Sequence, residues 1–230
     1  MSWVKICGIS KVEDVHAVAE VGGDAIGLLH IKTPDASQRV GSDRLTLPQL
    51  KQLRDVATEN GLEVVLLLHT TDESFLVRLL DNVRPFALQL QVHLPIDVLK
   101  NVRLRYPDLC IVRTIKNLGV YDALFEEAQS CDEAEHIDRI LVDSARPGGG
   151  TQHDWGTCRL LVESRVRKPI ILAGGLNVEN VASAIQTVKP WGVDVMSGVR
   201  NPDRTLSVSL VKQFVACAQS GFTGPMTREG

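Results

Sequence analysis

The chain has 230 residues, of which 44% are hydrophobic, 23% charged and 4% aromatic, and its formal net charge is −3. This composition is typical of a globular enzyme with a core of Val, Leu, Ile and Ala. The sequence contains no block of basic residues, which argues against a nucleic-acid-binding protein. No apolar stretch approaches the ~20 residues that a membrane span needs, and no signal peptide is recognisable, so we expect neither.

The five cysteines are scattered along the chain, and no two of them have Cys-x-x-Cys spacing. This arrangement predicts neither a zinc site nor a disulfide framework. An odd number of cysteines also fits a protein of the reducing cytoplasm.

Short apolar runs, most of them rich in β-branched residues, recur along the chain and predict buried strands of a parallel sheet. They are Trp3–Cys7, Ala25–Leu29, Glu63–Leu68, Phe86–Val92, Leu109–Ile115, Arg139–Val142, Pro169–Ala173 and Gly192–Val195. The segments between and after them have apolar residues at helical spacing. The expected helices lie within 12–19, 47–56, 75–80, 96–105, 119–129, 155–164, 178–188 and 206–218.

Eight strands alternating with eight helices predict a (β/α)₈ barrel, a fold of about 250 residues in a single domain. We expect the barrel to span residues 1–218 and residues 219–230 to form a frayed tail. A doubly wound open sheet is the alternative, because periodicity does not show whether a sheet closes. In a barrel, the polar segment 30–46, which carries Arg39, is expected to form a loop on the catalytic face. This loop is either a lid over the site or an ordinary surface loop.

Lys5 and Cys7 lie on the same face of the first strand, and Cys7 lies at its carboxyl end, where barrels place their chemistry. A nearby ammonium lowers the pKa of a thiol, so Cys7 is a candidate base or nucleophile. The alternative is that Cys7 only fills space in the core.

Two carboxylates occur in strands that are otherwise apolar. Asp143 ends the run Arg139–Val142 and is a candidate acid, or else a helix cap or structural acceptor. Asp194 lies within Gly192–Val195, where it could instead be the partner of a buried lysine such as Lys5.

Glycine-rich turns follow the last two strands. Gly174-Gly175 and Ser197-Gly198 place backbone N–H groups at strand ends, where (β/α)₈ barrels often bind phosphate. Glycines also end strands for steric reasons alone. Asp154, in His153-Asp154-Trp155, is expected to cap the sixth helix rather than to form a catalytic pair with His153.

Four segments together resemble the phosphoribosylanthranilate isomerase family. They are Lys5-Ile6-Cys7-Gly8, Gly23-Asp24-Ala25-Ile26-Gly27, the stretch from Leu172 to Val181 with Ala173-Gly174-Gly175-Leu176-Asn177, and Gly192-Val193-Asp194-Val195-x-Ser197-Gly198-Val199. Gly148-x-Gly150-x-x-His153-Asp154-Trp155 is similar to a further segment of some members. The resemblance implies a (β/α)₈ barrel that uses no metal or organic cofactor.

The family converts N-(5′-phosphoribosyl)anthranilate into 1-(2-carboxyphenylamino)-1-deoxyribulose 5-phosphate by an Amadori rearrangement in tryptophan biosynthesis. By resemblance, Cys7 is the general base and Asp143 the general acid. Arg39 holds the anthranilate carboxylate, and the turns Gly174-Gly175 and Ser197-Gly198 hold the phosphate. Lys5, Gln91 and Asp194 complete the expected substrate site.

The chain departs from the family pattern near the anthranilate end and beside the proposed phosphate site. Gln91 and Val92 stand where the family has His and Gly, with His93 two residues further on, and Arg200 stands where the family has Glu. These changes leave alternatives open: a phosphoribosylanthranilate isomerase, an isomerase of another phosphoribosyl amine, or a silent phosphosugar-binding barrel with a regulatory role. The expected protein is cytoplasmic, a monomer or homodimer, and acts on a small phosphosugar.

Overall fold

The computed structural model describes residues 2–30, 45–144 and 154–223, and within them eight parallel strands close into a barrel in the order β1 to β8. The strands are β1 (Trp3–Cys7), β2 (Ala25–His30), β3 (Glu63–Leu68), β4 (Ala87–Leu90), β5 (Cys110–Asn117), β6 (Arg139–Ser144), β7 (Ile170–Leu172) and β8 (Gly192–Val195). The first strand pairs with the last, with Trp3 opposite Gly192 and Lys5 opposite Asp194. The (β/α)₈ prediction is therefore confirmed, and the open-sheet alternative is wrong.

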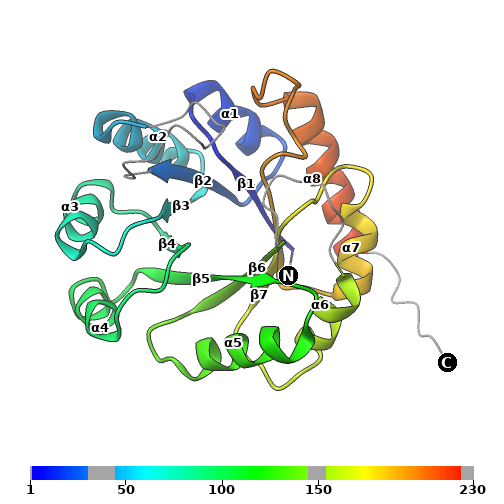
Figure 1. The fold of residues 1–230 in the computed structure, drawn as a ribbon. Coiled ribbons are helices and arrows are strands. Elements are labelled where there is room, and N and C mark those ends of the chain that lie inside the picture. The colour runs from blue at the N-terminus through cyan, green and yellow to red at the C-terminus, as the bar shows by residue number, and fades with distance from the viewer. Residues whose placement is uncertain (1, 31–44, 145–153, 224–230) are drawn as a thin grey trace.

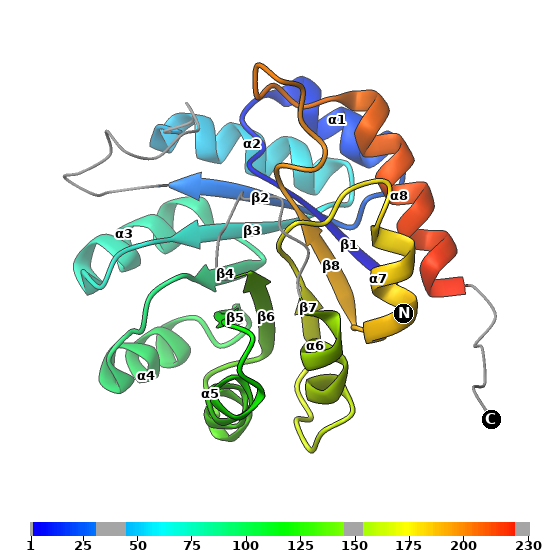
Figure 2. The same ribbon diagram turned by 45° about the vertical axis from the view of Figure 1, so that its right-hand side comes forward.

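Helices surround the strands on the outside of the barrel (Figure 1). They are α1 (Val12–Glu20), α2 (Leu47–Glu59), α3 (Glu73–Val83), α4 (Ile96–Arg105), α5 (Tyr121–Glu133), α6 (Trp155–Val162), α7 (Val181–Val188) and α8 (Val208–Thr223). Figure 2 shows α8 between α1 and α7, and it contacts both. No helix in the described part of the chain is both long and apolar enough to cross a membrane.

The strands separate two apolar regions, because alternate residues of a strand face opposite sides. Val4 and Ile6 of β1 belong to the larger core between the strands and the helices. Trp3 and Cys7 belong to the smaller core inside the barrel, together with residues from other strands. The inner face of β1 therefore presents Trp3, Lys5 and Cys7 in order from the amino to the carboxyl end of the barrel.

Local capping accounts for the starts of several helices. Thr46 and Gln49 form a capping box at α2, and the Asp72 side chain accepts a hydrogen bond from the backbone N–H of Phe75 at α3. Asp154 accepts hydrogen bonds from the N–H groups of Gly156 and Thr157, so its predicted role as the cap of α6 is confirmed.

Helix α8 continues to Thr223, past the predicted boundary at residue 218. Gly221 explains the extension, because a Cβ at that position would lie 3.0 Å from Cα of Ala182 in α7. The absence of a side chain lets the two helices approach closely, and Phe222 then packs on the core. Residues 224–230 lie outside the described residues.

Aromatic and charged side chains close the amino-terminal end of the barrel. The rings of Trp3 and Trp191 lie 5.3 Å apart, and the guanidinium of Arg139 lies 4.3 Å from the centre of the Trp191 ring. Glu63 accepts a hydrogen bond from the Trp3 indole and lies 3.6 Å from Arg139. These side chains fill the amino-terminal end of the barrel, opposite the end at which Cys7 lies.

Candidate active site

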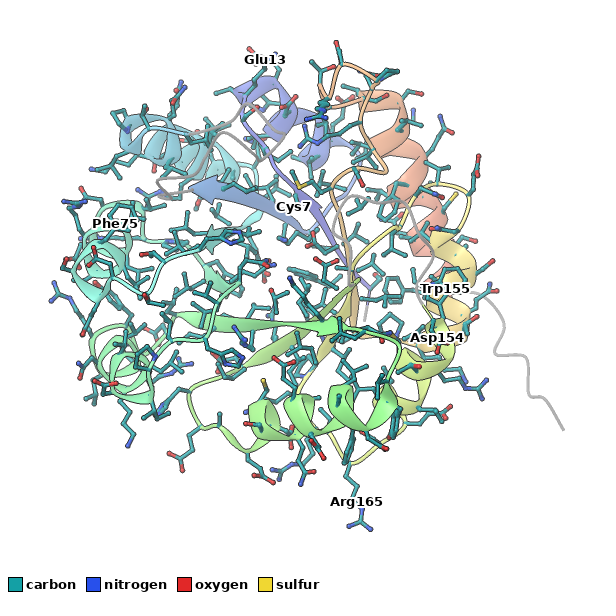
Figure 3. All side chains as sticks on the ribbon, viewed as in Figure 1. Cys7, Glu13, Phe75, Asp154, Trp155 and Arg165 are labelled. Atoms are coloured by element: carbon teal, nitrogen blue, oxygen red, sulfur yellow. The ribbon has the colours of Figure 1, made fainter. Side chains whose placement is uncertain are left out.

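The two residues predicted as base and acid both lie on the inner face of the barrel at the carboxyl ends of their strands. Cys7 ends β1 and is 3% exposed, and Figure 3 shows it inside the ring of strands. Asp143 is half-buried in β6, two residues after Leu141, which packs inside the barrel. In the β5–β6 register, Asp143 lies opposite Lys116, whose side chain is exposed. The barrel thus directs Cys7 and Asp143 toward one opening.

Beneath Cys7, Lys5 is completely buried and forms a polar chain with residues from three other strands. Its ammonium donates to Oδ2 of Asp194 at 2.8 Å and to Oε1 of Gln89 at 3.0 Å. The Gln89 amide in turn donates to the hydroxyl of Thr114 at 3.2 Å. The interpretation of Asp194 as the partner of a buried Lys5 is confirmed. Because Lys5 has no exposed surface, this position fits a role in holding Cys7 better than direct contact with a ligand.

The chain of polar contacts leaves one oxygen of Asp194 unused. Its Oδ1 atom is buried and has no hydrogen-bond partner among the described residues. Burial lowers the pKa of Lys5, but the carboxylate of Asp194 and the Cys7 thiol raise it more, so the net direction is upward. Lys5 therefore carries its positive charge throughout the neutral range, directly below the thiol.

Burial opposes the effect of Lys5 on the thiol of Cys7. Burial raises the pKa of the thiol to about 11, although the cations of Lys5 and Arg200 lower it. Asp194 also raises this pKa, because a nearby negative charge disfavours a thiolate. Lys5 lowers the pKa of the thiol, as its ammonium predicts, but the cost of removing water from the thiolate outweighs this effect.

Gly27 provides the space that Cys7 and Lys5 occupy. It lies opposite Cys7 in the β1–β2 register, and a Cβ there would lie 2.7 Å from Sγ of Cys7 and 3.1 Å from Cε of Lys5. The Gly27 carbonyl also accepts hydrogen bonds from the N–H groups of Gly8 and Ile9. Sequence reasoning named Gly27 within a segment of the family resemblance but gave it no role, although a glycine inside a strand indicates a close approach.

The turns predicted to hold phosphate lie side by side. Gly174 and Gly175 have φ angles of +83° and +68°, a conformation that favours glycine. Asn177, just after them, pairs with Gly198 in an isolated bridge. A Cβ on Gly198 would collide with the carbonyl oxygen of Leu176. The loops after β7 and β8 therefore form one continuous surface, with Ser197 exposed at its edge.

The remaining predicted residues are placed less centrally. Gln91 is half-buried immediately after β4, and its N–H donates to the carbonyl of Leu68. Strand β4 ends at Leu90, so His93 does not continue the inner face. Its side chain is 80% exposed and lies 3.6 Å from Glu127 of α5.

Arg39 and His153 lie outside the described residues. Asp154 and Trp155 lie at α6, away from Cys7 (Figure 3). Within residues 2–30, 45–144 and 154–223, no group of three or more His, Cys, Asp or Glu side chains could hold a metal ion.

Comparison with known proteins identifies the family. The family model described as N-(5′-phosphoribosyl)anthranilate (PRA) isomerase matches residues 4–216. The chain belongs to the phosphoribosylanthranilate isomerase family. It is 37% identical to the N-(5′-phosphoribosyl)anthranilate isomerase of Methanocella arvoryzae over 94% of this chain and 97% of that protein. It is 36% identical to the same enzyme of Haloarcula marismortui, over 97% and 99% of the two chains.

The structural match agrees with this family. A solved phosphoribosyl anthranilate isomerase in complex with reduced 1-(o-carboxyphenylamino)-1-deoxyribulose 5-phosphate is 26% identical, with a TM-score of 0.75. The match covers 96% of this chain and 100% of that one. Membership in the phosphoribosylanthranilate isomerase family therefore extends across the whole barrel, from β1 with Cys7 to the loop after β8.

Proposed function

We propose that this protein is a phosphoribosylanthranilate isomerase that converts N-(5′-phosphoribosyl)anthranilate into 1-(2-carboxyphenylamino)-1-deoxyribulose 5-phosphate. The observation that carries the proposal is the placement of Cys7 and Asp143 on the inner face of β1 and β6, at the end of the barrel next to the two glycine turns. Relatives of that name, more than 30% identical over nearly the whole chain, support the same reaction.

In the proposed reaction, Asp143 gives its proton to the ring oxygen of the ribose as the bond from C1′ to that oxygen breaks. The nitrogen lone pair then forms an iminium with C1′. The Cys7 thiolate removes the proton from C2′, and the electrons of that bond neutralise the iminium to give an enolamine. The proton held by Cys7 then adds to C1′, and the hydroxyl group on C2′ loses its proton to the Asp143 carboxylate as the enolamine becomes the ketone. Both side chains regain their starting protonation states, so the reaction is an isomerisation with no gain or loss of atoms.

The thiol of Cys7 must ionise before it can accept this proton, and burial opposes its ionisation. The iminium adds a positive charge next to the thiol, above the buried ammonium of Lys5. An additional nearby cation lowers the pKa of a thiol. Ring opening by Asp143 therefore prepares both the acidic carbon and the base that attacks it.

The two ends of the substrate are held by different loops in this proposal. The turns Gly174-Gly175 and Ser197-Gly198 bind the phosphate, which fixes the sugar by contacts remote from the reacting carbon. Arg39 binds the anthranilate carboxylate, and Gln91 lines the pocket for the aromatic ring. Loss of Arg39 should then raise KM for phosphoribosylanthranilate without changing the affinity for inorganic phosphate.

The decisive test is turnover of phosphoribosylanthranilate generated in the assay, followed by the loss of its fluorescence. Cys7→Ser and Asp143→Asn should each lower kcat by about 10²–10⁴-fold, the usual contribution of a general acid or base. Cys217→Ser, a cysteine change in α8, is the matched control and should remain active. A wild-type protein that binds phosphosugars but does not turn over this substrate would instead be the silent barrel.

We also propose that the protein acts in the cytoplasm, as a monomer or homodimer, without nucleic acid, metal or organic cofactor. All five cysteines are free, which supports a reducing compartment. Light scattering during gel filtration measures the oligomeric state. Activity that disappears after dialysis against a chelator and returns with a metal ion would contradict the cofactor part.

A further inference from the structure

Arg200, in the loop after β8, bridges to the turn that follows β1. Its Nη2 atom donates to the carbonyl oxygens of Cys7, at 3.1 Å, and Gly8, at 2.5 Å. Its Nη1 atom donates to the carbonyl of Arg204 in its own loop at 2.9 Å. One guanidinium therefore joins the loop after the last strand to the residue that ends the first strand.

The turn after β1 is held from two opposite sides. On one side, the Gly27 carbonyl accepts the N–H groups of Gly8 and Ile9 at 2.9 and 3.0 Å. On the other side, the guanidinium of Arg200 donates hydrogen bonds to the carbonyl oxygens of Cys7 and Gly8. Gly8 has φ +78°, and a Cβ there would lie 2.6 Å from Nη2 of Arg200. The absence of a side chain at Gly8 is thus what allows the guanidinium to reach both carbonyls.

Among the residues that the structure describes, no carboxylate forms an ion pair with Arg200. Its three hydrogen bonds go to main-chain carbonyls, and among the described residues no Asp or Glu oxygen lies within 4.0 Å of its guanidinium. The charged groups that act on Cys7 are Lys5 of β1, Asp194 of β8 and Arg200. Arg200 also lowers the pKa of the Asp14 carboxyl group in α1, although burial raises that pKa by more.

We propose that Arg200 is a positioning residue for Cys7, which fixes the end of β1 through two carbonyl oxygens and keeps a positive charge beside the thiol. This role rests on the proposed function of Cys7 as the base. Fixing the turn keeps Sγ aligned with the C2′ proton. The fixed cation favours the thiolate against the adverse effects of burial and Asp194, and it acts before any substrate is bound.

Two variants separate the hydrogen bonds from the charge. Arg200→Gln keeps a donor but removes the charge, and Arg200→Lys keeps the charge but cannot form the same fork of donors. Arg105→Gln is the matched control, since Arg105 at the end of α4 forms a surface ion pair with Asp81 of α3, outside the site. Thermal unfolding measures whether each variant is folded.

The first measurement needs no substrate. The rate of Cys7 alkylation by iodoacetamide, quantified on its peptide by mass spectrometry, is followed from pH 7 to pH 11. In Arg200→Gln the rise in rate should move to higher pH, whereas Arg200→Lys should keep a profile close to that of the wild type. The pH profile of Cys7 alkylation in Arg105→Gln should match that of the wild type. An unchanged profile in a folded Arg200→Gln variant would overturn the effect of the charge.

The second measurement is turnover of phosphoribosylanthranilate. Both Arg200 variants should lose kcat, by up to about 10²-fold, because a small displacement of a catalytic group has effects of that size. KM should change less, since the phosphate turns are intact. Wild-type kcat in both variants would overturn the positioning role. If the wild type itself shows no turnover, the proposed function fails, while the alkylation profiles still decide whether Arg200 acts on Cys7.

Discussion

Lys5 and Asp194, which are 189 positions apart in the sequence, form a 2.8 Å ion pair inside the barrel, between its first and last strands. The pair is almost completely shielded from water, with side-chain exposures of 1% and 9%. It connects the closure of the barrel to the site above it, because the same ammonium lies below Cys7.

We expect removal of one member of this pair to be severely destabilising. Asp194→Asn leaves the ammonium of Lys5 buried without its counter-charge, a change that typically lowers the free energy of unfolding by about 3–5 kcal/mol. Urea unfolding measures the loss. The double variant Lys5→Met with Asp194→Leu should recover part of it, because no charge is then left buried. A double variant less stable than the sum of the two single changes would refute this account.

The stability of the protein should fall with pH because of Cys7. The pKa of an ordinary thiol is 9.0, whereas the folded protein raises it to about 11. Between these values the unfolded chain has lost a proton that the folded chain retains, so stability falls as pH rises, by at most about 1.4 kcal/mol per pH unit.

Cys7→Ala removes this contribution. From pH 9 to pH 11, the free energy of unfolding should fall more steeply for the wild type than for Cys7→Ala. The other buried cysteines are present in both proteins, so their effects cancel in the difference. A difference that is constant over this range would show that the thiol ionises equally well in both states.

Gly27→Ala should damage catalysis more than folding. The added methyl lies 2.7 Å from Sγ of Cys7, so the thiol must move. Overpacking of this kind costs about 1–3 kcal/mol of stability, while the displaced base could lower kcat by about 10²-fold. Gly192→Ala is the matched control, because its methyl meets Trp3 at the opposite end of the barrel. Equal losses of kcat in the two variants, at equal stability, would contradict a specific role for Gly27.

Gly198→Ala should weaken phosphate binding. The methyl collides with the Leu176 carbonyl and separates the two turns that Asn177 and Gly198 join. We expect KM for phosphoribosylanthranilate to rise about tenfold, equivalent to about 1.4 kcal/mol, with a parallel loss of inhibition by inorganic phosphate. Gly221→Ala overpacks α7 and α8 away from these turns and serves as the control. Unchanged phosphate inhibition in Gly198→Ala would place the anion elsewhere.

Much of the barrel could be predicted because its strands are buried on both faces. Strands β1, β3 and β8 begin and end where the apolar runs do. The run Phe86–Val92 predicted a longer β4, because residues of a turn at the barrel rim can be as apolar as those of a strand. That error matters for His93, which would share the face of Gln91 only if the strand continued.

The site was predictable in position but not in its electrostatics. Period-two alternation places Lys5 and Cys7 on one face, and a buried Asp194 needs a cation, so their partnership follows from local rules. The pKa of Cys7 does not, because it depends on the burial that all eight strands produce together. The contact of Arg200 with the Cys7 carbonyl spans 193 positions, a relation that no local pattern contains.

The contact between Trp3 and Trp191 gives the protein a built-in optical signal for barrel closure. Trp3 opens β1, and Trp191 immediately precedes β8, so the two rings come within 5.3 Å only when the last strand joins the first. Among the eight strands of the barrel, β8 also comes last in the chain. Coupling between the two indoles in the near-ultraviolet circular dichroism spectrum would therefore report barrel closure, in the wild-type sequence and without an added label.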